Sequence, residues 1–214
     1  MEKDYFRYYK PRMLLLLIVM LSVFYGYLLD LFTTYVNSFL NSPYFYFPTA
    51  SSLIILTFLK IDKKGLKWSF TKRLFWVKDI SGRYSGSIKY KNYHTKIEET
   101  KNCFLEIEQS ASKICVNTYF DFKNNKNTEK TTSKSLVCSI VSKDDFDNQT
   151  LVFTYHNSGN ILKGLQPSNG TNILELIKRK SGFFLEGIYY TDKNPQTKGT
   201  MKVKFISNKL QKKF

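Results

Sequence analysis

Two apolar runs dominate the first quarter of the 214-residue chain. Apart from Asp30, residues 13–59 carry no charged side chain. The first run, residues 13–29, reads MLLLLIVMLSVFYGYLL, and its apolar flanks extend it to the length of about 20 residues that a membrane-spanning helix needs. A second apolar run follows it and no small-residue cleavage site does, so a signal peptide explains the pattern less well. The run predicts a first transmembrane helix.

The second apolar run ends in SSLIILTFL at Leu59. Pro43 and Pro48 interrupt its beginning. We place this span at about residues 44–59, with Pro43 near the first turn, where proline is tolerated. The two runs together predict a two-helix transmembrane module over residues 1–60.

Lysine and arginine residues set the expected orientation of this module. Four of them precede the first run and six follow the second within residues 60–73, whereas the connection at residues 30–42 has none. By the positive-inside rule, both termini of this multi-pass protein are expected in the cytoplasm. Residues 61–78 mix basic and aromatic side chains, which predicts a basic linker that lies on anionic headgroups; a solvated linker is the alternative.

From Ile80 onward, apolar and polar positions alternate with a period of two, which is typical of half-buried strands. The predicted strands are 80–90, 103–109, 113–121, 133–143, 151–157, 172–176, 185–191 and 199–205. The polar tract 123–134 (KNNKNTEKTTSK) is predicted to be a hairpin loop without a function. Residues 79–214 are therefore expected to form a cytoplasmic all-β domain, an eight-stranded up-and-down antiparallel β-barrel, because closure removes exposed strand edges.

Several polar side chains fall on the inward-facing positions of these strands. They either hydrogen-bond one another and cap the barrel, or line a ligand pocket at an open mouth. Aromatic faces beside amide groups suit a purine base, and cations at strand ends, Arg83 among them, suit phosphates. The predicted ligand contacts are Tyr84, Gln109, Tyr155, Asn157, Tyr189 and Thr191, with Thr171 and Lys198 at the rim.

Composition narrows the class of protein further. Aromatic residues make up 16% of the chain, which is too many for a disordered segment, and 33 Lys+Arg against 17 Asp+Glu make it basic. The three cysteines have no CxxC spacing, so they are expected to be buried thiols rather than disulfides or zinc ligands. The GxSxG, P-loop, GxGxxG and HExxH motifs are all absent. We therefore expect no enzymatic activity, no catalytic residue, no metal and no cofactor.

Five motifs resemble, in their order, one known family. They are DISGRYSGSI at 79–88, LEIEQSASKICVNTYF at 105–120, LVFTYHNSG at 151–159, NGTNILEL at 169–176 and LEGIYYTDKNPQTKGTMKV at 185–203. With the two N-terminal apolar runs, they resemble the two-transmembrane β-barrel effectors of CBASS antiphage systems, also described as SMODS-associated 2TM β-strand-rich effectors. The chain departs from the family at Asn169, where His is frequent, and at Lys193, where Arg is frequent.

The resemblance implies that one chain both senses a messenger and disrupts the membrane. A partner nucleotidyltransferase would make a cyclic di- or oligonucleotide on phage infection, and the barrel would bind it. Ligand-bound chains would then oligomerise and disrupt the bacterial inner membrane, causing abortive infection. The expected partners are this messenger, inner-membrane lipids and further copies of the chain, but no DNA or RNA polymer. The residues alone leave two alternatives open: a membrane-anchored barrel that binds a lipid or other apolar ligand, and an adaptor with a filled barrel.

Overall fold

The structure of the chain is a computed structural model that describes residues 5–40, 49–93, 95–122, 129–142, 149–159 and 166–212. These residues divide into two compact units. The helical unit holds the described residues up to Lys78 together with 110–112. The barrel unit begins at Asp79 and contains all the described strands.

The helical unit contains one long apolar helix, α1 (Pro11–Leu40), of 30 residues. An 18-residue window within residues 11–39 has a mean hydropathy of 2.3, so α1 is long and apolar enough to cross a membrane, as the first run predicted. The predicted connection at residues 30–42 is wrong as far as Leu40, because the helix continues past Asp30. One charge does not end a helix whose next ten residues include neither glycine nor proline.

The second helix, α2 (Ala50–Lys64), has 15 residues. The hydroxyl of Thr49 caps it by accepting a hydrogen bond from the N–H of Ser52 at 3.4 Å. At this length α2 is shorter than a spanning helix, so within the described ranges α1 alone has the length and composition of a span. Residues 44–48 of the second predicted span lie outside the described residues.

Residues 61–78, predicted to be a linker, contribute to the core of the helical unit. They contain the end of α2 and a short 3-10 helix, η1 (Thr71–Leu74). Phe75 forms an isolated β-bridge with Tyr9, and the two buried rings lie 4.6 Å apart. This segment is folded against the N-terminal residues, and its contact with lipid headgroups stays a prediction.

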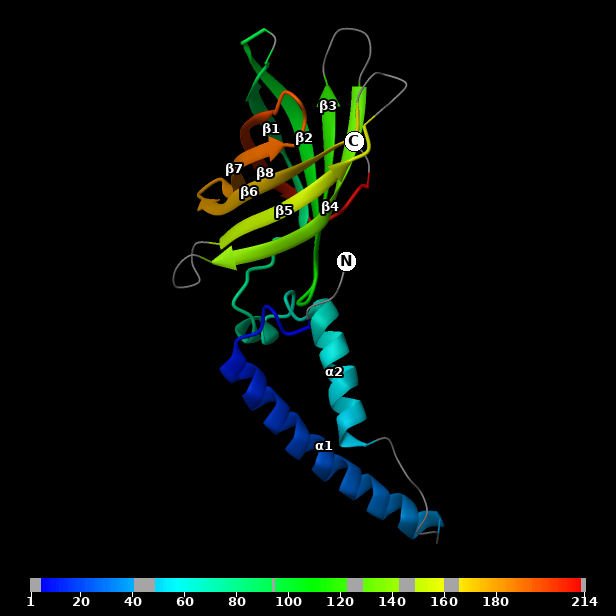
Figure 1. The fold of residues 1–214 in the computed structure, drawn as a ribbon. Helices are drawn as coiled ribbons and strands as arrows, with labels where there is room; N and C mark the ends of the chain where they lie inside the picture. The colour runs from blue at the N-terminus through cyan, green and yellow to red at the C-terminus, as the bar shows by residue number, and fades with distance from the viewer. Residues whose placement is uncertain are drawn as a thin grey trace. The chain divides into compact units, whose positions relative to one another are not determined.

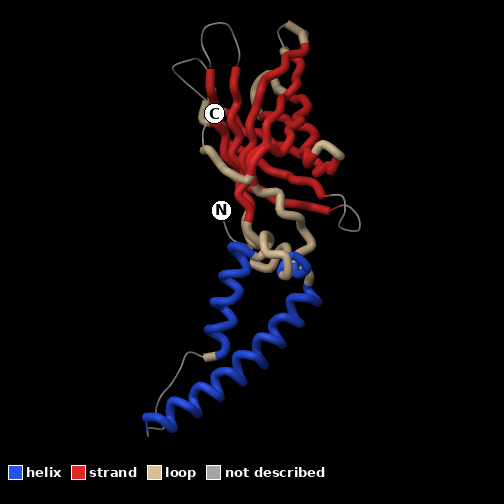
Figure 2. The backbone as a smooth tube through the Cα atoms, turned by 180° about the vertical axis from the view of Figure 1, so that it is seen from behind, coloured by secondary structure: helices blue, strands red, loops and turns tan. Residues whose placement is uncertain are grey.

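The barrel unit contains eight antiparallel strands among its described residues, and they close into a barrel in chain order (Figures 1 and 2). The strands are β1 (Gly82–Lys91), β2 (Glu98–Gln109), β3 (Ile114–Phe122), β4 (Glu129–Ser142), β5 (Gln149–Asn157), β6 (Ser168–Arg179), β7 (Gly182–Thr191) and β8 (Lys198–Ser207). Strand β8 pairs with β1, which leaves no open edge among the described strands. The predicted eight-stranded antiparallel barrel is confirmed.

Aliphatic side chains on the inward-facing positions form the core of the barrel. Each of the following is at most 1% exposed: Leu105, Ile107, Val116, Leu151, Leu174, Leu185 and Val203. Burial of a side chain of this size stabilises the fold by about 1.5–3 kcal/mol relative to exposure. The alternation read from the sequence therefore identified the core face of most strands.

Strand β4 departs from the prediction in two ways. It begins at Glu129, so the predicted loop 123–134 is wrong from that residue on; residues 123–128 lie outside the described residues. Its register against β5 shifts between Ser135 and Val137, and Leu136 and Val137 are exposed. Such a β-bulge interrupts the period of two, which explains why the run 133–143 shows no clear inward face in the sequence.

Candidate functional site

The two ends of the barrel differ in the side chains that they bury. Because consecutive strands are antiparallel, the end at which β1 leads into β2 also holds the ends of β3, β5 and β7. The starts of β4, β6 and β8 lie there as well. We name it the β1–β2 end, and the opposite one the β2–β3 end.

Polar side chains are buried on inward-facing positions toward the β1–β2 end. All are less than 8% exposed: Thr118, Thr131, Ser133, Ser168, Asn172 and Thr191. Three of their oxygens, Thr131 Oγ1, Ser133 Oγ and Asn172 Oδ1, have no hydrogen-bond partner within the described part of the chain. A buried polar atom without a partner destabilises a fold by about 1–3 kcal/mol. Within the described residues, these three oxygens therefore have unused hydrogen-bonding capacity.

Tyrosine rings lie beside this polar cluster. Tyr155 and Tyr189 are buried, and Tyr155 pairs with Gly170, where a Cβ atom would lie 2.5 Å from the Cζ atom of the Tyr155 ring. Glycine at 170 therefore makes room for that ring. Burial raises the pKa of Tyr155 to about 12, and Asp192 adds to the effect. Burial also raises the pKa of Tyr189 above its usual range, with a contribution from Tyr155. Both hydroxyls are protonated at neutral pH and can donate hydrogen bonds.

A charged group that the sequence reasoning missed completes this end of the barrel. The Tyr90 hydroxyl donates to Glu99 Oε2, and Asn92 Nδ2 donates to Oε1 at 2.6 Å. The hydrogen bond from Tyr90, followed by that from Asn92, lowers the pKa of Glu99, so the carboxylate is ionised. Lys101 Nζ lies 4.7 Å from the centre of the Tyr90 ring. Extending the inward row of Cys103 backward by two and four residues would have found Lys101 and Glu99.

The structure brings four of the predicted ligand contacts together. Tyr155, Asn157, Tyr189 and Thr191 occupy inward-facing positions toward the β1–β2 end. Two of them, Asn157 and Thr191, also accept hydrogen bonds from nearby turns. Asn157 Oδ1 accepts a hydrogen bond from the N–H of Gly159 at 2.8 Å, and the Thr191 hydroxyl accepts one from the N–H of Thr197 at 3.2 Å. Part of this polar set therefore caps the barrel.

Two predicted contacts lie at the β2–β3 end instead. The Tyr84 hydroxyl donates to the carbonyl of Ile80 at 2.9 Å, and the N–H of Ile80 donates to Gln109 Oε1 at 2.8 Å. These bonds hold residue 80, just before β1, against the barrel. The structure does not bring Tyr84 and Gln109 together with the other four residues, and their contact with a ligand stays a prediction.

The two residues predicted at the rim are on the outside of the β1–β2 end. Thr171 pairs with Thr154 and Tyr190 on the outward-facing row and is half-buried, and Lys198 is exposed at the start of β8. Beside them, Asn169 Nδ2 donates to Asp192 Oδ2 at 2.9 Å, and Asn169 Oδ1 lies 2.9 Å from His156 Nδ1. Asn169 is thus engaged in a rim network, and the contact of Thr171 and Lys198 with a ligand stays a prediction.

Arg83, expected to meet phosphates at a strand end, has a different environment. Its Nη1 atom donates to Glu106 Oε1 at 2.6 Å, and the side chains of this pair are 3% and 0% exposed. The pair lies toward the β2–β3 end on the outward-facing row. A buried guanidinium that is already paired with a carboxylate is not free to bind a phosphate, so this expectation is wrong.

Comparison with known proteins identifies the family to which the chain belongs. No curated protein matches the chain. A family model described as the Cap15 cyclic dinucleotide receptor domain matches residues 75–204, which is more than half of the chain. The match spans strands β1 to β7 and most of β8, and it includes the buried polar side chains and the tyrosines of the β1–β2 end. The chain therefore belongs to the Cap15 cyclic dinucleotide receptor family.

Proposed function

We propose that the chain is a CBASS effector that binds a cyclic dinucleotide at the β1–β2 end of its barrel. The observation that carries the proposal is the presence there of buried tyrosine rings beside buried side-chain oxygens without partners in the described residues. The family description supplies the class of ligand. We propose no reaction for this site: it binds and releases its ligand unchanged.

The groups at this end correspond to the parts of a cyclic dinucleotide. We propose that the bases stack on the rings of Tyr155 and Tyr189, which are 5% and 6% exposed in the structure. The ammonium group of Lys101, on the inward-facing row, suits a phosphate. Lys198 faces outward at the rim, and its contact with a second phosphate stays a prediction. The ionised Glu99 carboxylate accepts hydrogen bonds only, so it suits a base edge that presents N–H donors, as guanine does.

A lipid or another apolar ligand is the second candidate. It would offer no hydrogen bonds to Asn172 Oδ1 and Ser133 Oγ, which would then stay buried without partners. Each such group is destabilising by about 1–3 kcal/mol. A nucleotide offers both donors and acceptors to these atoms, so the polar cluster favours it over an apolar ligand.

The melting temperature of the detergent-solubilised chain is expected to rise when its cyclic dinucleotide is added. A ligand that binds only the folded state adds about 2.7 kcal/mol at 100 times its dissociation constant. For a domain of this size, that is a rise of about 5–10 °C. The measurement is thermal unfolding with a panel of cyclic dinucleotides, with the matching linear dinucleotides and a fatty acid as controls. Stabilisation by the fatty acid and by no nucleotide would replace this function with apolar-ligand binding.

We further propose that ligand binding makes chains assemble and disrupt the inner membrane. The length and hydropathy of α1 support an anchor, and the resemblance to the two-transmembrane effectors supports a second span and a cytoplasmic barrel. The two predicted spans of one chain would be too few to enclose a channel, so disruption requires several chains side by side. A cytoplasmic ligand, made by a partner nucleotidyltransferase, can drive this only by favouring a barrel state that associates better.

Cross-linking in native membranes is expected to show oligomers only after the cognate nucleotide is added, and before a dye enters the cells. Asp30 is exposed in α1, and we expect Asp30→Lys to abolish dye entry without changing ligand binding, because a lysine ammonium cannot accept the hydrogen bonds of a polar contact that the carboxylate makes between chains. The control is Thr34→Lys, which puts the same charge one turn further along α1. An equal loss of dye entry in both variants would show that Asp30 is an ordinary interfacial carboxylate without a specific contact between chains. Oligomers that are equally abundant without the nucleotide would contradict the proposal that ligand binding drives assembly.

A further inference from the structure

A buried ion pair lies on the outer wall of the barrel, where side chains are normally exposed. Tyr84, Leu105 and Ile107 face inward, so Arg83 and Glu106, which alternate with them, face outward. Even so, Arg83 is 2% exposed and Glu106 is fully buried. Something on the outside of the barrel must therefore cover them.

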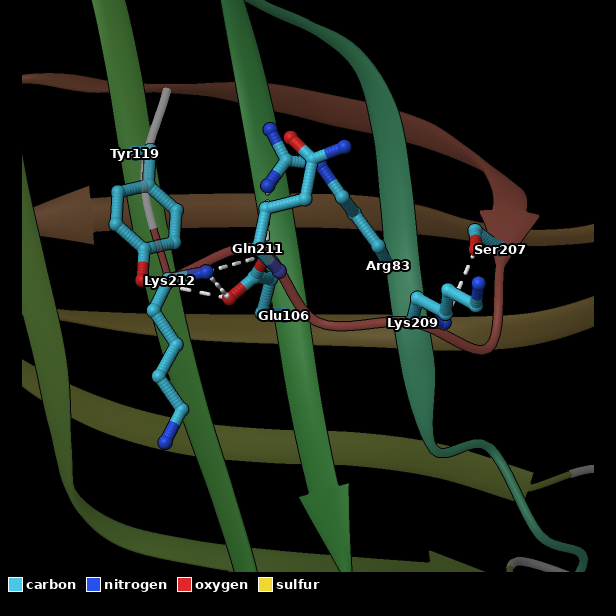
Figure 3. Close-up of polar contacts among 7 residues, drawn as sticks. All are labelled: Arg83, Glu106, Tyr119, Ser207, Lys209, Gln211 and Lys212. Atoms are coloured by element: carbon cyan, nitrogen blue, oxygen red, sulfur yellow. Dashed lines mark hydrogen bonds and ion pairs between the residues drawn. The ribbon is translucent and has the colours of Figure 1, made fainter.

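The covering segment is the part of the chain that follows β8, residues 208–212. The backbone N–H of Gln211 donates to Glu106 Oε1 at 2.7 Å, and that of Lys212 lies 3.1 Å from Oε2 (Figure 3). Lys212 has a positive φ of 55°, the left-handed conformation that turns successive N–H groups toward one anion. Its side chain points away from Glu106 (Figure 3). Main-chain groups, rather than lysine charges, bind this segment to the wall.

Neighbouring wall residues hold the carboxylate in place for these N–H groups. Arg83 donates to Oε1 at 2.6 Å, and its guanidinium lies 4.5 Å from the centre of the Phe104 ring. The Tyr119 hydroxyl lies 3.4 Å from Oε2. Glu106 thus receives hydrogen bonds from β1, from β3 and from residues 208–212. A buried carboxylate needs such partners, and the segment supplies a large share of them.

This segment crosses the place where β8 pairs with β1, which we call the β1–β8 seam. Strands β8 and β1 are the last and the first described strands, and theirs is the one neighbouring pair in the described barrel that is not consecutive in the chain. Their register shifts between Arg83 and Tyr84, at the same end of the seam. The segment leaves β8, passes β1 and binds Glu106 on β2. It therefore bridges the seam where strand pairing is irregular.

We propose that residues 208–212 are a clasp that keeps the β1–β8 seam closed by binding the Glu106 carboxylate. With the clasp bound, β8 is tied to β2 as well as to β1. With the clasp released, the irregular end of the seam has only its own ladder hydrogen bonds and opens more often. The clasp is a device separate from the ligand site, which lies toward the other end of the barrel.

Hydrogen exchange on the full chain in detergent tests this clasp. Gln211→Pro removes the N–H that donates to Glu106 without touching the wall, and Gln211→Ala keeps that N–H and is its matched control. A chain that stops after Ser207 lacks the whole clasp. We expect the amides of residues 83–88 and 202–206 to exchange about tenfold faster or more in the proline variant and in the shortened chain. Residues 151–155 and 171–175, away from the seam, should keep their rates, and the alanine variant should match the original chain.

Two outcomes would overturn the clasp. Seam amides that exchange at the original rate in Gln211→Pro would show that the segment does not hold the seam. Equal acceleration of the seam and of β5 and β6 in that variant would show a general loss of stability instead. The proline variant leaves every barrel residue in place, so it remains informative even if the shortened chain fails to fold.

Discussion

Replacing Glu106 by alanine is expected to lower the free energy of unfolding of the barrel by about 3–5 kcal/mol. The substitution leaves the Arg83 guanidinium, now 2% exposed, buried without its carboxylate. It also removes the acceptor of the Gln211 and Lys212 N–H groups. Removing one partner of a buried pair costs more than the pair itself contributes, because the remaining charge stays buried without that partner. Urea unfolding, followed by far-ultraviolet circular dichroism, measures the loss.

A second carboxylate on the outer wall provides the control. Glu186 on β7 lies 2.7 Å from Arg179 and 3.1 Å from Lys202, but these side chains are 21%, 41% and 58% exposed. Water screens an exposed pair and solvates the cations when their partner is removed. Glu186→Ala is therefore expected to cost about 1 kcal/mol or less. Similar losses in both variants would mean that the covering of Glu106 by residues 208–212 adds nothing to stability.

Replacing Tyr155 by alanine is expected to weaken cyclic dinucleotide binding by about five- to 150-fold. That range corresponds to the roughly 1–3 kcal/mol that a base stacked on an aromatic ring contributes. The ring is 5% exposed at the β1–β2 end, on the inward-facing row that also carries Asn157. Calorimetric titration with the nucleotide that gives the largest thermal shift measures the affinity.

Tyr84→Phe is the matched control for this experiment. It removes the hydroxyl that donates to Ile80 at the β2–β3 end and keeps the ring. If the ligand binds at the β1–β2 end, this variant should bind it with unchanged affinity. Unchanged binding by Tyr155→Ala, with the barrel folded, would remove the site proposed here. If Tyr84→Phe lowered the affinity for the nucleotide as much as Tyr155→Ala does, the ligand would have contacts at both ends of the barrel.

The sequence predicted the barrel well because strand alternation is a local property. Ile107 and Leu151 are buried on the faces that the alternation gave them. The end of the barrel toward which a residue lies depends also on the direction of its strand, which reverses from one strand to the next. Tyr84, near the start of β1, and Tyr155, near the end of β5, therefore share a face of the sheet but lie toward opposite ends.

Two features of the barrel were missed for different reasons. Thr131 and Ser133 belong to a lysine- and asparagine-rich tract that reads as a loop, yet strand pairing with β3 buries them. Local polarity misled the prediction because tertiary pairing overrides it. The burial of Glu106 depends on main-chain N–H groups more than 100 residues away. Every residue except proline has such a group, so no sequence pattern could have indicated this contact.

The reactivity of the three thiols of the barrel can report whether the sheet around them is closed or open. Cys103 and Cys138 are buried, and burial raises the pKa of Cys103 to about 12, so almost none of it is the reactive thiolate at neutral pH. Cys115 is partly exposed, with the Ser135 hydroxyl 3.7 Å from its sulfur. An alkylating reagent therefore has one accessible sulfur among the cysteines of the closed barrel. Modification of the other two reports the opening of the sheet around them, without any engineered label.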